Sequence, residues 1–541
     1  MTPELKLALC QTNPRLGDLA GNVARIAESA TAAAADGAEL IVFPELALTG
    51  YPPEDLLLNS EFVAGAMAAM ATLARQLPEH ATCLVGTVWD DGHGLQNVLQ
   101  VVNNGQLGVR YAKTRLPNYG VFDEARYFTP GSGPTVISVN GVTVGLSICE
   151  DIWFPGAPAS ECVALGAELI VNASASPFHA GKIHERIDVL AARAMEHNVP
   201  IAYCALVGGQ DELVFDGQSL LIDSAGLVIA RAKPFVEDRL SIHLGGQQAP
   251  RLEVEPDLLT EIEGALHLGL ADYVGKNGFN GVVLGLSGGI DSAVVATLAV
   301  DAIGAENVQA AVMPSPWSSA ETQADARLLA SNLGIELFEF SIGPLMEAWK
   351  TTLGDSADGP GSALAAENIQ ARIRGNILMG LSNTHGWLVV TTGNKSELAV
   401  GYSTLYGDAA GGFGLLKDVP KGTVYKLARL RNSRSDSPIP ESIIDRAPSA
   451  ELRPGQRDDD SLPPYDRLDE ILRLHVEEQL DENAIAAAGF DGAEVARILT
   501  LVDRSEYKRR QYPPGVKITP LAFGRDRRMP MTNLWRSQRE R

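Results

Sequence analysis

The chain has 541 residues, of which 45% are hydrophobic, and it carries a formal net charge of −23. A chain of this length is too long for one ordinary core, so two or more domains are expected. The negative charge argues against nonspecific binding to nucleic acid or to anionic membranes, because both need a cationic surface.

The cysteine pattern and the apolar runs indicate a cellular compartment. Five cysteines are scattered without a CxxC pair, which argues against a zinc site or a disulfide framework. No signal-peptide pattern and no apolar run of about 20 residues is found, so we expect a cytoplasmic protein without a membrane partner. Four of the cysteines are expected in the core: Cys10, Cys83, Cys162 and Cys204.

The first half of the chain alternates short β-like runs with alanine-rich helical stretches, which is typical of an α/β domain. A helix is expected at Asn22–Ala35, between two strands, and Asn103-Asn104-Gly105 predicts a tight turn between two antiparallel strands. The expected strands are Leu5–Cys10, Glu39–Phe43, Cys83–Val88, Val98–Val102, Leu107–Tyr111, Thr143–Ile148, Leu169–Asn172 and Ile201–Ala205.

A glycine- and proline-containing stretch from Leu244 to Pro250 breaks this pattern and predicts a domain boundary. The expected division is a first domain at 1–245, a linker at 246–257 and a second domain at 258–541. The second domain starts with a helix at Leu258–Lys276 and continues with strand–loop–helix units. Their strands are expected at Gly281–Leu284, Val308–Met313 and Leu388–Thr391, so a doubly wound parallel sheet is predicted.

Three stretches interrupt the helix and strand pattern of the second domain: Gly354–Ser362, Asp408–Gly414 and Arg431–Asp466. Mobile loops over a site and plain surface loops are equally good interpretations. The C-terminus is rich in arginine, and a solvated tail or subunit contact is favoured there over a phosphate site. These arginines are Arg525, Arg527, Arg528, Arg536, Arg539 and Arg541.

A glycine-rich loop follows the expected strand Gly281–Leu284 and reads Gly285-Leu286-Ser287-Gly288-Gly289-Ile290-Asp291-Ser292. Glycine lets backbone N–H groups approach a phosphate, and the following helix, expected from about Ser292, adds its positive N-terminal end. Asp291 would repel a phosphate unless a cation lay between them, and Mg²⁺ is the usual one. The loop lacks the Walker pattern and resembles the pyrophosphate loop of N-type ATP pyrophosphatases, which split ATP into AMP and pyrophosphate.

A second reaction centre is predicted at Cys149, which follows the apolar run Val142–Ile148 and precedes an acidic pair. This position suggests an exposed thiol nucleophile at a strand end. A thiol nucleophile needs a base and a group that stabilises the oxyanion. Glu45 and Lys113 follow two other expected strands and are the candidates. A buried carboxylate with a raised pKa would take the thiol proton near neutral pH.

Glu45, Lys113 and Cys149 resemble the Glu-Lys-Cys triad of the nitrilase (carbon-nitrogen hydrolase) superfamily. The resemblance extends to the sequence segments around these residues, which are FPELALTGYP, KTRLPNYGVFDEARYF and GLSICEDIWFP. It implies an α-β-β-α sandwich, with Glu45 as general base, Cys149 as thioester-forming nucleophile and Lys113 as oxyanion stabiliser. It also implies that Glu124 is a second carboxylate that positions the others.

A nitrilase-like half joined to an N-type pyrophosphatase half resembles the glutamine-dependent NAD⁺ synthetase family. Four sequence segments of the second half separate this family from GMP and asparagine synthetases and from tRNA-thiolating enzymes. They are AAENIQARIRGNILMG, TTGNKSELAVGYSTLYGD, ELRPGQRDDDSLPPYD and SEYKRRQYPPGVKIT. The resemblance implies a Rossmann-like second domain of the adenine nucleotide alpha hydrolase type. It also implies ATP-dependent amidation of deamido-NAD⁺ with ammonia from L-glutamine, giving NAD⁺, AMP, pyrophosphate and L-glutamate, the final step of NAD biosynthesis.

The family's binding residues carry over one by one. The resemblance implies glutamine binding by Tyr119, Ser176 and Lys182. In the second half it implies ATP binding by 285–292, Thr392 and Lys421. Deamido-NAD⁺ would contact Asn368, Arg372, Glu397 and Lys508, with Mg²⁺ held by Asp291 and Glu397. Asn368 and Arg372 are four residues apart and would share one helix face.

Other interpretations remain open at this point. An amidotransferase of the same pyrophosphatase class acting on another substrate is the main alternative, and a degenerate binding or regulatory half is a weaker one. Fusion of an ammonia producer to an ammonia consumer suggests a tunnel that keeps ammonia unprotonated. The resemblance also implies a homo-oligomer, dimer-based and up to an octamer.

Overall fold

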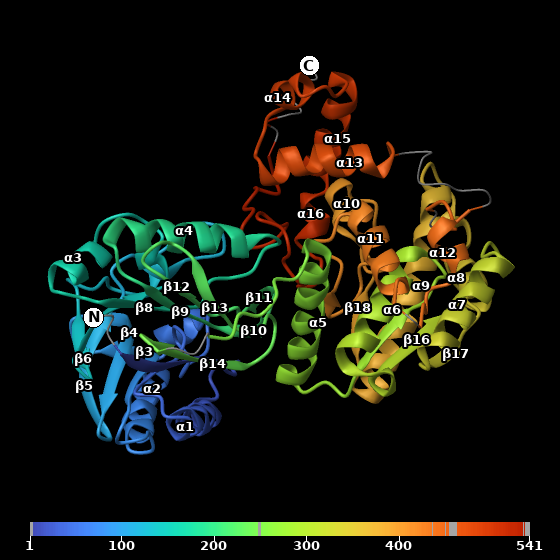
Figure 1. The fold of residues 1–541 in the computed structure, drawn as a ribbon. Coiled ribbons are helices and arrows are strands. Elements are labelled where there is room, and N and C mark those ends of the chain that lie inside the picture. The colour runs from blue at the N-terminus through green and yellow to red at the C-terminus, as the bar shows by residue number, and fades with distance from the viewer. Residues whose placement is uncertain are drawn as a thin grey trace. The chain divides into compact units, whose positions relative to one another are not determined.

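The computed structural model describes residues 4–246, 250–434, 436–448, 451–453, 462–533 and 535. The chain divides into two compact units, Met1–Leu258 and Leu259–Arg541 (Figure 1). Across these described ranges, no helix has both the length and the apolar character needed to span a membrane.

The first unit contains two six-stranded sheets, in the orders β14-β1-β2-β3-β4-β5 and β13-β12-β9-β8-β7-β6. The strands of the first sheet are β1 (Leu5–Gln11), β2 (Leu40–Val42), β3 (Thr82–Asp90), β4 (Leu95–Asn103), β5 (Gln106–Ala112) and β14 (Asp238–Leu244). Those of the second are β6 (Val136–Val139), β7 (Val142–Ile148), β8 (Leu169–Ser174), β9 (Ile201–Ala205), β12 (Leu220–Ile222) and β13 (Val228–Arg231). The strands β10 (Val207–Gln210) and β11 (Leu213–Asp216) form a separate pair.

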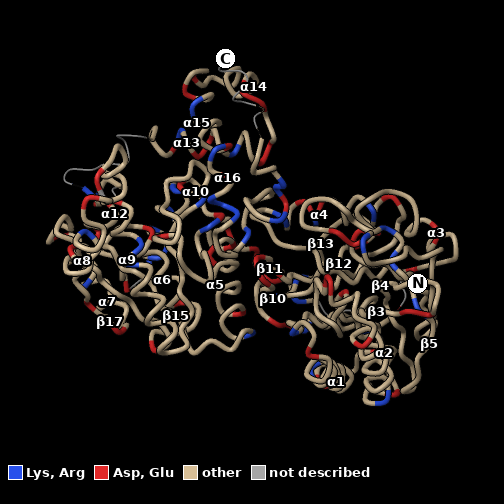
Figure 2. The backbone as a smooth tube through the Cα atoms, turned by 180° about the vertical axis from the view of Figure 1, so that it is seen from behind, with Lys and Arg blue, Asp and Glu red and all other residues tan. Residues whose placement is uncertain are grey.

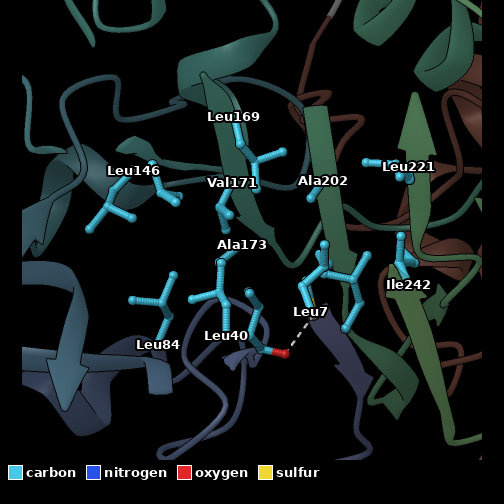
Figure 3. Packing of buried hydrophobic residues seen from close by; sticks show 14 of the residues in the cluster. Leu7, Leu40, Leu84, Leu146, Leu169, Val171, Ala173, Ala202, Leu221 and Ile242 are labelled. Atoms are coloured by element: carbon cyan, nitrogen blue, oxygen red, sulfur yellow. Dashed lines mark hydrogen bonds between the residues drawn. The ribbon is translucent and has the colours of Figure 1, made fainter. Parts of the chain in front are cut away.

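The two sheets pack face to face because alternate residues of each strand are apolar on the shared side. Leu7 and Leu40 of the first sheet face Leu146 and Val171 of the second in one buried cluster (Figure 3). The opposite face of β1 presents Ala8 and Cys10 to the helices α1 (Leu19–Ala35) and α2 (Ser60–Ala74).

The outer face of the second sheet is covered in the same way by α3 (Ala159–Ala164) and α4 (Lys182–His197). The predicted α-β-β-α sandwich is therefore confirmed. The four cysteines expected in the core are all buried. Short 3-10 helices connect the strands: η1 (Glu54–Leu58), η2 (Glu124–Arg126) and η3 (Cys149–Ile152).

The predicted hairpin turn is also present. Asn104 and Gly105 both have positive φ, 49° and 69°, and lie between the antiparallel strands β4 and β5. A two-residue loop with both φ values positive matches the right-handed twist of the flanking strands.

The second unit is built on a five-stranded sheet in the order β17-β16-β15-β18-β19. Its strands are β15 (Val282–Gly285), β16 (Val308–Val312), β17 (Glu336–Glu339), β18 (Leu388–Thr391) and β19 (Phe413–Gly414), and all neighbours pair in parallel. The strand order reverses between β15 and β18, as in a doubly wound fold, so that prediction is confirmed. Ligands of such sheets bind at the carboxyl ends of the strands at this switch point.

Helices lie on both faces of this sheet, and a helical cluster follows it (Figure 1). They are α5 (Leu258–Asn277), α6 (Ile290–Ile303), α7 (Ala320–Leu333), α8 (Gly343–Leu353), α9 (Ser362–His385), α10 (Lys395–Val400), α11 (Lys421–Asn432), α12 (Glu441–Asp445), α13 (Tyr465–Leu472), α14 (Glu482–Ala487), α15 (Gly492–Arg504) and α16 (Glu506–Arg509). The short turns are η4 (Ala305–Asn307), η5 (Gly354–Ala357) and the π-helix η7 (Arg473–Glu477).

Some expectations need correction. The helix after the glycine loop begins at Ile290 rather than near Ser292, because the extended Gly289 is already its N-cap. The stretch expected as loop at Asp408–Gly414 ends in the strand β19, which adds to the sheet edge, and the stretch at Arg431–Asp466 contains α12. Residues 435, 449–450 and 454–461 of that stretch lie outside the described residues, as do Arg536, Arg539 and Arg541.

Candidate active sites

Cys149 directly follows β7 and adopts a φ of 42°, in the left-handed region that a side chain rarely occupies. Such backbone strain persists where the surrounding structure enforces it, as at many reactive positions. The thiol is only 2% exposed, so the expectation of an exposed nucleophile is wrong. The carbonyl of Cys149 accepts a hydrogen bond from Asn172 Nδ2 of β8 at 3.3 Å, which ties two strand ends together.

Three strand ends and η2 bring the predicted catalytic groups of the first unit to one place. Lys113 follows β5, and its Nζ lies 2.7 Å from Glu45 Oε1 and 2.8 Å from the Glu124 carboxylate. Glu45 and Lys113 have fully buried side chains, and that of Glu124 is 6% exposed. The one ammonium pairs with both carboxylates, and one negative charge is in excess when both acids are ionised.

Burial shifts the pKa values of these groups. Burial opposes the positive charge of Lys113, but Glu124 and Glu45 outweigh it and hold its pKa well above the usual value. Burial raises the pKa of Glu124 to about 7, with Lys113 opposing the rise and Glu45 adding to it. Burial and the charge of Glu45 raise the pKa of Cys149 well above its usual value, against the effect of Lys113. The resting sulfur is therefore a thiol, and it needs a base when it attacks.

Several positioning residues of this site were missed by sequence reasoning. Asn97 Nδ2 donates to Glu45 Oε1 at 2.7 Å, and the backbone N–H of Ala175 donates to Glu45 Oε2 at 2.9 Å. The hydroxyl of Tyr51 donates to Glu124 Oε1 at 2.9 Å. The available signal for Asn97 was a polar residue beside the apolar pair Val98 and Leu99 of β4.

Asp151 was noted only as half of an acidic pair, and it ties the end of β5 to the end of β7, which belong to different sheets. Its carboxylate accepts hydrogen bonds from the N–H groups of Arg115 at 2.8 Å and Ile148 at 3.0 Å. It also accepts from the hydroxyls of Tyr111 and Thr114, both at 2.7 Å. The segment after Lys113 is thereby fixed to the residue before Cys149.

The residues predicted to bind glutamine are only partly brought together. The hydroxyl of Tyr119 donates to Glu150 Oε1 at 2.9 Å, and the charge of Lys182 also acts on Glu150. Lys182 begins α4 and lies over the ring of Trp153, 4.4 Å from its centroid. Ser176 is buried two residues after β8. Glu150 is therefore a shared neighbour that the prediction did not include.

In the second unit, the glycine loop lies between β15 and α6, at the switch point of the sheet. Leu286 and Ile290 are buried and anchor it, while Ser287 is exposed. The hydroxyls of Ser287 and Ser292 lie 3.1 Å apart. Gly288 has a φ of +81°, and a Cβ there would come within 2.2 Å of the Thr322 carbonyl oxygen, so glycine is required.

The predicted metal ligands Asp291 and Glu397 lie in the first turns of α6 and α10, the helices that follow the two strands flanking the switch point. Lys421 Nζ forms ion pairs with both, at 3.1 Å to Glu397 and closely with Asp291. Two carboxylates that reach one cation fit a divalent ion, and Mg²⁺ prefers such oxygen ligands. Thr392, the residue after β18, is half-buried.

Three of the four residues predicted to bind deamido-NAD⁺ contact the segment 401–405, which follows α10, while the Glu397 carboxylate pairs with Lys421. Lys508 Nζ donates to the carbonyls of Gly401 and Ser403, both at 2.7 Å. Asn368 Oδ1 accepts from Thr404 at 2.9 Å, and Arg372 Nε donates to the Leu405 carbonyl at 3.3 Å. Burial lowers the pKa of Lys508. Lys508 and Arg509 lie in the last turn of α16, where the backbone is coloured blue for Lys and Arg (Figure 2).

Comparisons with known proteins agree with both units. The carbon-nitrogen hydrolase family model matches residues 6–244, and the NAD synthase model matches residues 262–512. Fold and site thus define an enzyme that joins a carbon-nitrogen hydrolase unit to an NAD synthase unit.

Relatives match the whole chain. A glutamine-dependent NAD(+) synthetase from Thermotoga maritima is 46% identical and one from Acinetobacter baylyi is 43% identical, each over 98% of this chain and 98–99% of the relative. The chain belongs to the glutamine-dependent NAD(+) synthetase family.

Solved structures show the same relationship. The synthetase from Acinetobacter baumannii, solved in complex with adenosine diphosphate, has a TM-score of 0.78 and 40% identity, with 98% of this chain and 99% of that chain covered. A synthetase from Cytophaga hutchinsonii has a TM-score of 0.86 over 99% of both chains, and at 24% identity it shows the fold alone.

Proposed function

We propose that this protein converts deamido-NAD⁺, ATP, L-glutamine and water into NAD⁺, AMP, pyrophosphate and L-glutamate. The observation that supports the proposal is that two clusters of residues with the expected chemistry lie on one chain. They are Glu45, Lys113 and Cys149 in the first unit, and the loop 285–292 with Glu397 in the second. An amidotransferase acting on another substrate is not favoured, because full-length relatives carry the name glutamine-dependent NAD(+) synthetase.

The first unit releases ammonia from glutamine. Glu45 takes the proton of the Cys149 thiol, and the thiolate attacks the side-chain amide carbon of glutamine. Lys113 stabilises the oxyanion, and the proton returns from Glu45 to the leaving ammonia. Water, deprotonated by Glu45, then hydrolyses the thioester to glutamate. Tyr119, Ser176 and Lys182 hold glutamine at this centre, and Glu124 holds Lys113.

The second unit activates the acceptor. The nicotinate carboxylate of deamido-NAD⁺ attacks the α-phosphorus of ATP, and pyrophosphate leaves along the loop 285–292. Ammonia then attacks the acyl carbon of the adenylate and AMP departs. Asp291 and Glu397 would hold Mg²⁺, which neutralises phosphate charge. Thr392 and Lys421 contact ATP, while Asn368, Arg372 and Lys508 contact deamido-NAD⁺.

Further parts of the proposal concern organisation. Residues 1–245 serve as the glutaminase domain, 246–257 as a linker and 258–541 as the synthetase domain. Ammonia passes between the centres without release, since ammonium in bulk water is not a nucleophile. We also propose a cytoplasmic homo-oligomer, dimer-based and up to an octamer, and the family resemblance supports this assembly.

Channelling has a direct test. Glutamine-driven NAD⁺ formation is measured with and without an ammonia-scavenging enzyme, and ammonium-driven formation serves as the positive control for the scavenger. Channelling predicts that glutamine-driven synthesis persists while ammonium-driven synthesis stops. Loss of both would contradict it.

A further inference from the structure

The end of β8 lies beside the nucleophile. β7 and β8 run parallel with Ile148 opposite Ala173; Cys149 directly follows β7, and Ser174 is the last residue of β8. Asn172 of β8 bonds the Cys149 carbonyl, so the two ends are held together. Ser174 is fully buried and has no part in the mechanism described above.

The hydroxyl of Ser174 has its own hydrogen available. Tyr203 of β9 donates its hydroxyl hydrogen to Ser174 Oγ at 2.7 Å, so Ser174 is the acceptor in that contact. A serine hydroxyl carries one hydrogen, and Ser174 can use it toward another acceptor. Burial and the charge of Glu45 raise the pKa of Cys149, and the neighbouring Ser174 side chain acts against that rise.

Tyr203 is itself held firmly. The Arg186 guanidinium of α4 lies over its ring, 5.4 Å from the centroid, and pairs with both Asp216 oxygens at 2.9 Å. Gln218 adds a hydrogen bond to Asp216 at 3.0 Å. Arg186, Tyr203 and Asp216 are each about 1% exposed. These contacts hold the Tyr203 ring in place, with its hydroxyl against Ser174.

The Cys149 thiolate needs a hydrogen-bond donor because the Lys113 ammonium, the cation that favours the thiolate, is shared with other groups. Lys113 already donates to Glu45 and to Glu124. The charged and titratable groups whose fields act on Cys149 come from several elements, and most of them are acids or phenols. They are Glu45, Lys113, Glu150, Tyr51, Tyr119, Arg186 and Tyr203. A neutral hydroxyl stabilises the thiolate without weakening Glu45 as a base, whereas a second cation would stabilise the Glu45 carboxylate too.

We propose that the Ser174 hydroxyl donates a hydrogen bond to the Cys149 sulfur during glutamine hydrolysis, and that Tyr203 orients it. Ser174 is then a further catalytic residue, and Tyr203 is a positioning residue supported by the Arg186–Asp216 pair. This inference rests on the proposed role of Cys149 as the nucleophile.

The test measures the thiol itself, separately from turnover. The full-length protein and its Ser174→Ala and Tyr203→Phe variants are alkylated with iodoacetamide from pH 6 to pH 10, with Cys149→Ala giving the background from the other cysteines. A hydrogen bond to a charged group is worth about one pKa unit or more. We expect the Ser174→Ala curve to move to higher pH by about one unit, roughly tenfold slower at fixed pH.

Tyr203→Phe removes a single oxygen and should move the curve in the same direction by a smaller amount. An unchanged curve in Ser174→Ala would overturn the proposal, even if glutamine hydrolysis fell, because Ser174 would then act on substrate or fold. If Ser174→Ala does not fold, the alkylation curve of Tyr203→Phe is the test, and an unchanged curve in that variant would overturn the proposal. Absence of glutamine hydrolysis in the unmodified protein would instead contradict the proposed function.

Discussion

Asn394 Nδ2 donates a 2.9 Å hydrogen bond to Asp291 Oδ1 across the switch point of the parallel sheet. Its own Oδ1 accepts from the backbone N–H of Glu397 at 3.0 Å and caps α10. One fully buried amide therefore orients the Asp291 carboxylate and fixes the backbone that carries Glu397, the two residues that would hold Mg²⁺. Groups that orient metal ligands in this way matter almost as much as the ligands themselves.

Replacement of Asn394 by alanine should weaken the synthetase reaction. Without the amide, Asp291 loses its orientation, and we expect ammonium-driven NAD⁺ formation to fall roughly 10–100-fold with a higher Mg²⁺ requirement. The measurement is the initial rate of AMP release against Mg²⁺ concentration. Asn277→Ala removes an exposed amide at the end of α5 and is the matched control. If Asn394→Ala and Asn277→Ala show the same rates of AMP release and the same Mg²⁺ requirement, the proposed role of Asn394 is contradicted.

Glu124 should give glutamine hydrolysis an ionisation near neutral pH. Folding raises its pKa to about 7, so it is protonated below that pH and charged above it. The charged form completes the pair with Lys113, and kcat/KM for glutamine should rise as the pH increases through about 7. Glu124→Gln should lose this rise. If kcat/KM for glutamine rises with pH in the same way in wild type and in Glu124→Gln, the ionisation belongs to another group.

The raised pKa of Glu124 also affects stability. Because folding favours its protonated form, its contribution is fully present below the unfolded pKa near 4.5 and is lost as the pH rises through about 7. The melting temperature of wild type relative to Glu124→Gln should therefore fall between pH 5 and pH 8. A rise over this range would contradict the direction of the shift.

Gly86 of β3 lies against the backbone that carries Glu45. A Cβ at this position would be 2.2 Å from the Pro44 carbonyl oxygen and 2.4 Å from Leu46 N, so the segment must move. A displacement near 1 Å at a catalytic group costs roughly 100-fold in rate, and we expect Gly86→Ala to lose about that much glutamine hydrolysis. Gly133→Ala, where a Cβ meets nothing within 4 Å, is the control. Equal rates for the two variants would rule out this constraint.

The sequence predicted the parts of each site that depend on local order. Strand ends carry Lys113 and Cys149, and the glycine loop has a local pattern, so both were found from neighbouring residues. Asn97 was missed because its partner Glu45 is 52 residues away, and only the strand pairing brings them together.

The burial of Cys149 was missed for the same reason, since the residues that surround it come from distant strands. The C-terminal helices α13 and α15 have apolar faces at helical spacing, and their shared core with α10 depends on tertiary packing. The buried ammonium of Lys395 contacts Asp418, Glu477 and Thr519, and these partners lie 23 to 124 residues away in sequence. No local pattern specifies such a network.

Product analysis of wild type and Cys149→Ala tests the central claim most directly. Each protein receives ATP, Mg²⁺ and deamido-NAD⁺, with either glutamine or an ammonium salt, and NAD⁺ and AMP are quantified. The two-centre account predicts equal amounts of NAD⁺ and AMP from wild type with either nitrogen source, and from Cys149→Ala with ammonium alone. NAD⁺ formation from glutamine by Cys149→Ala, or loss of both reactions in that folded variant, would contradict it.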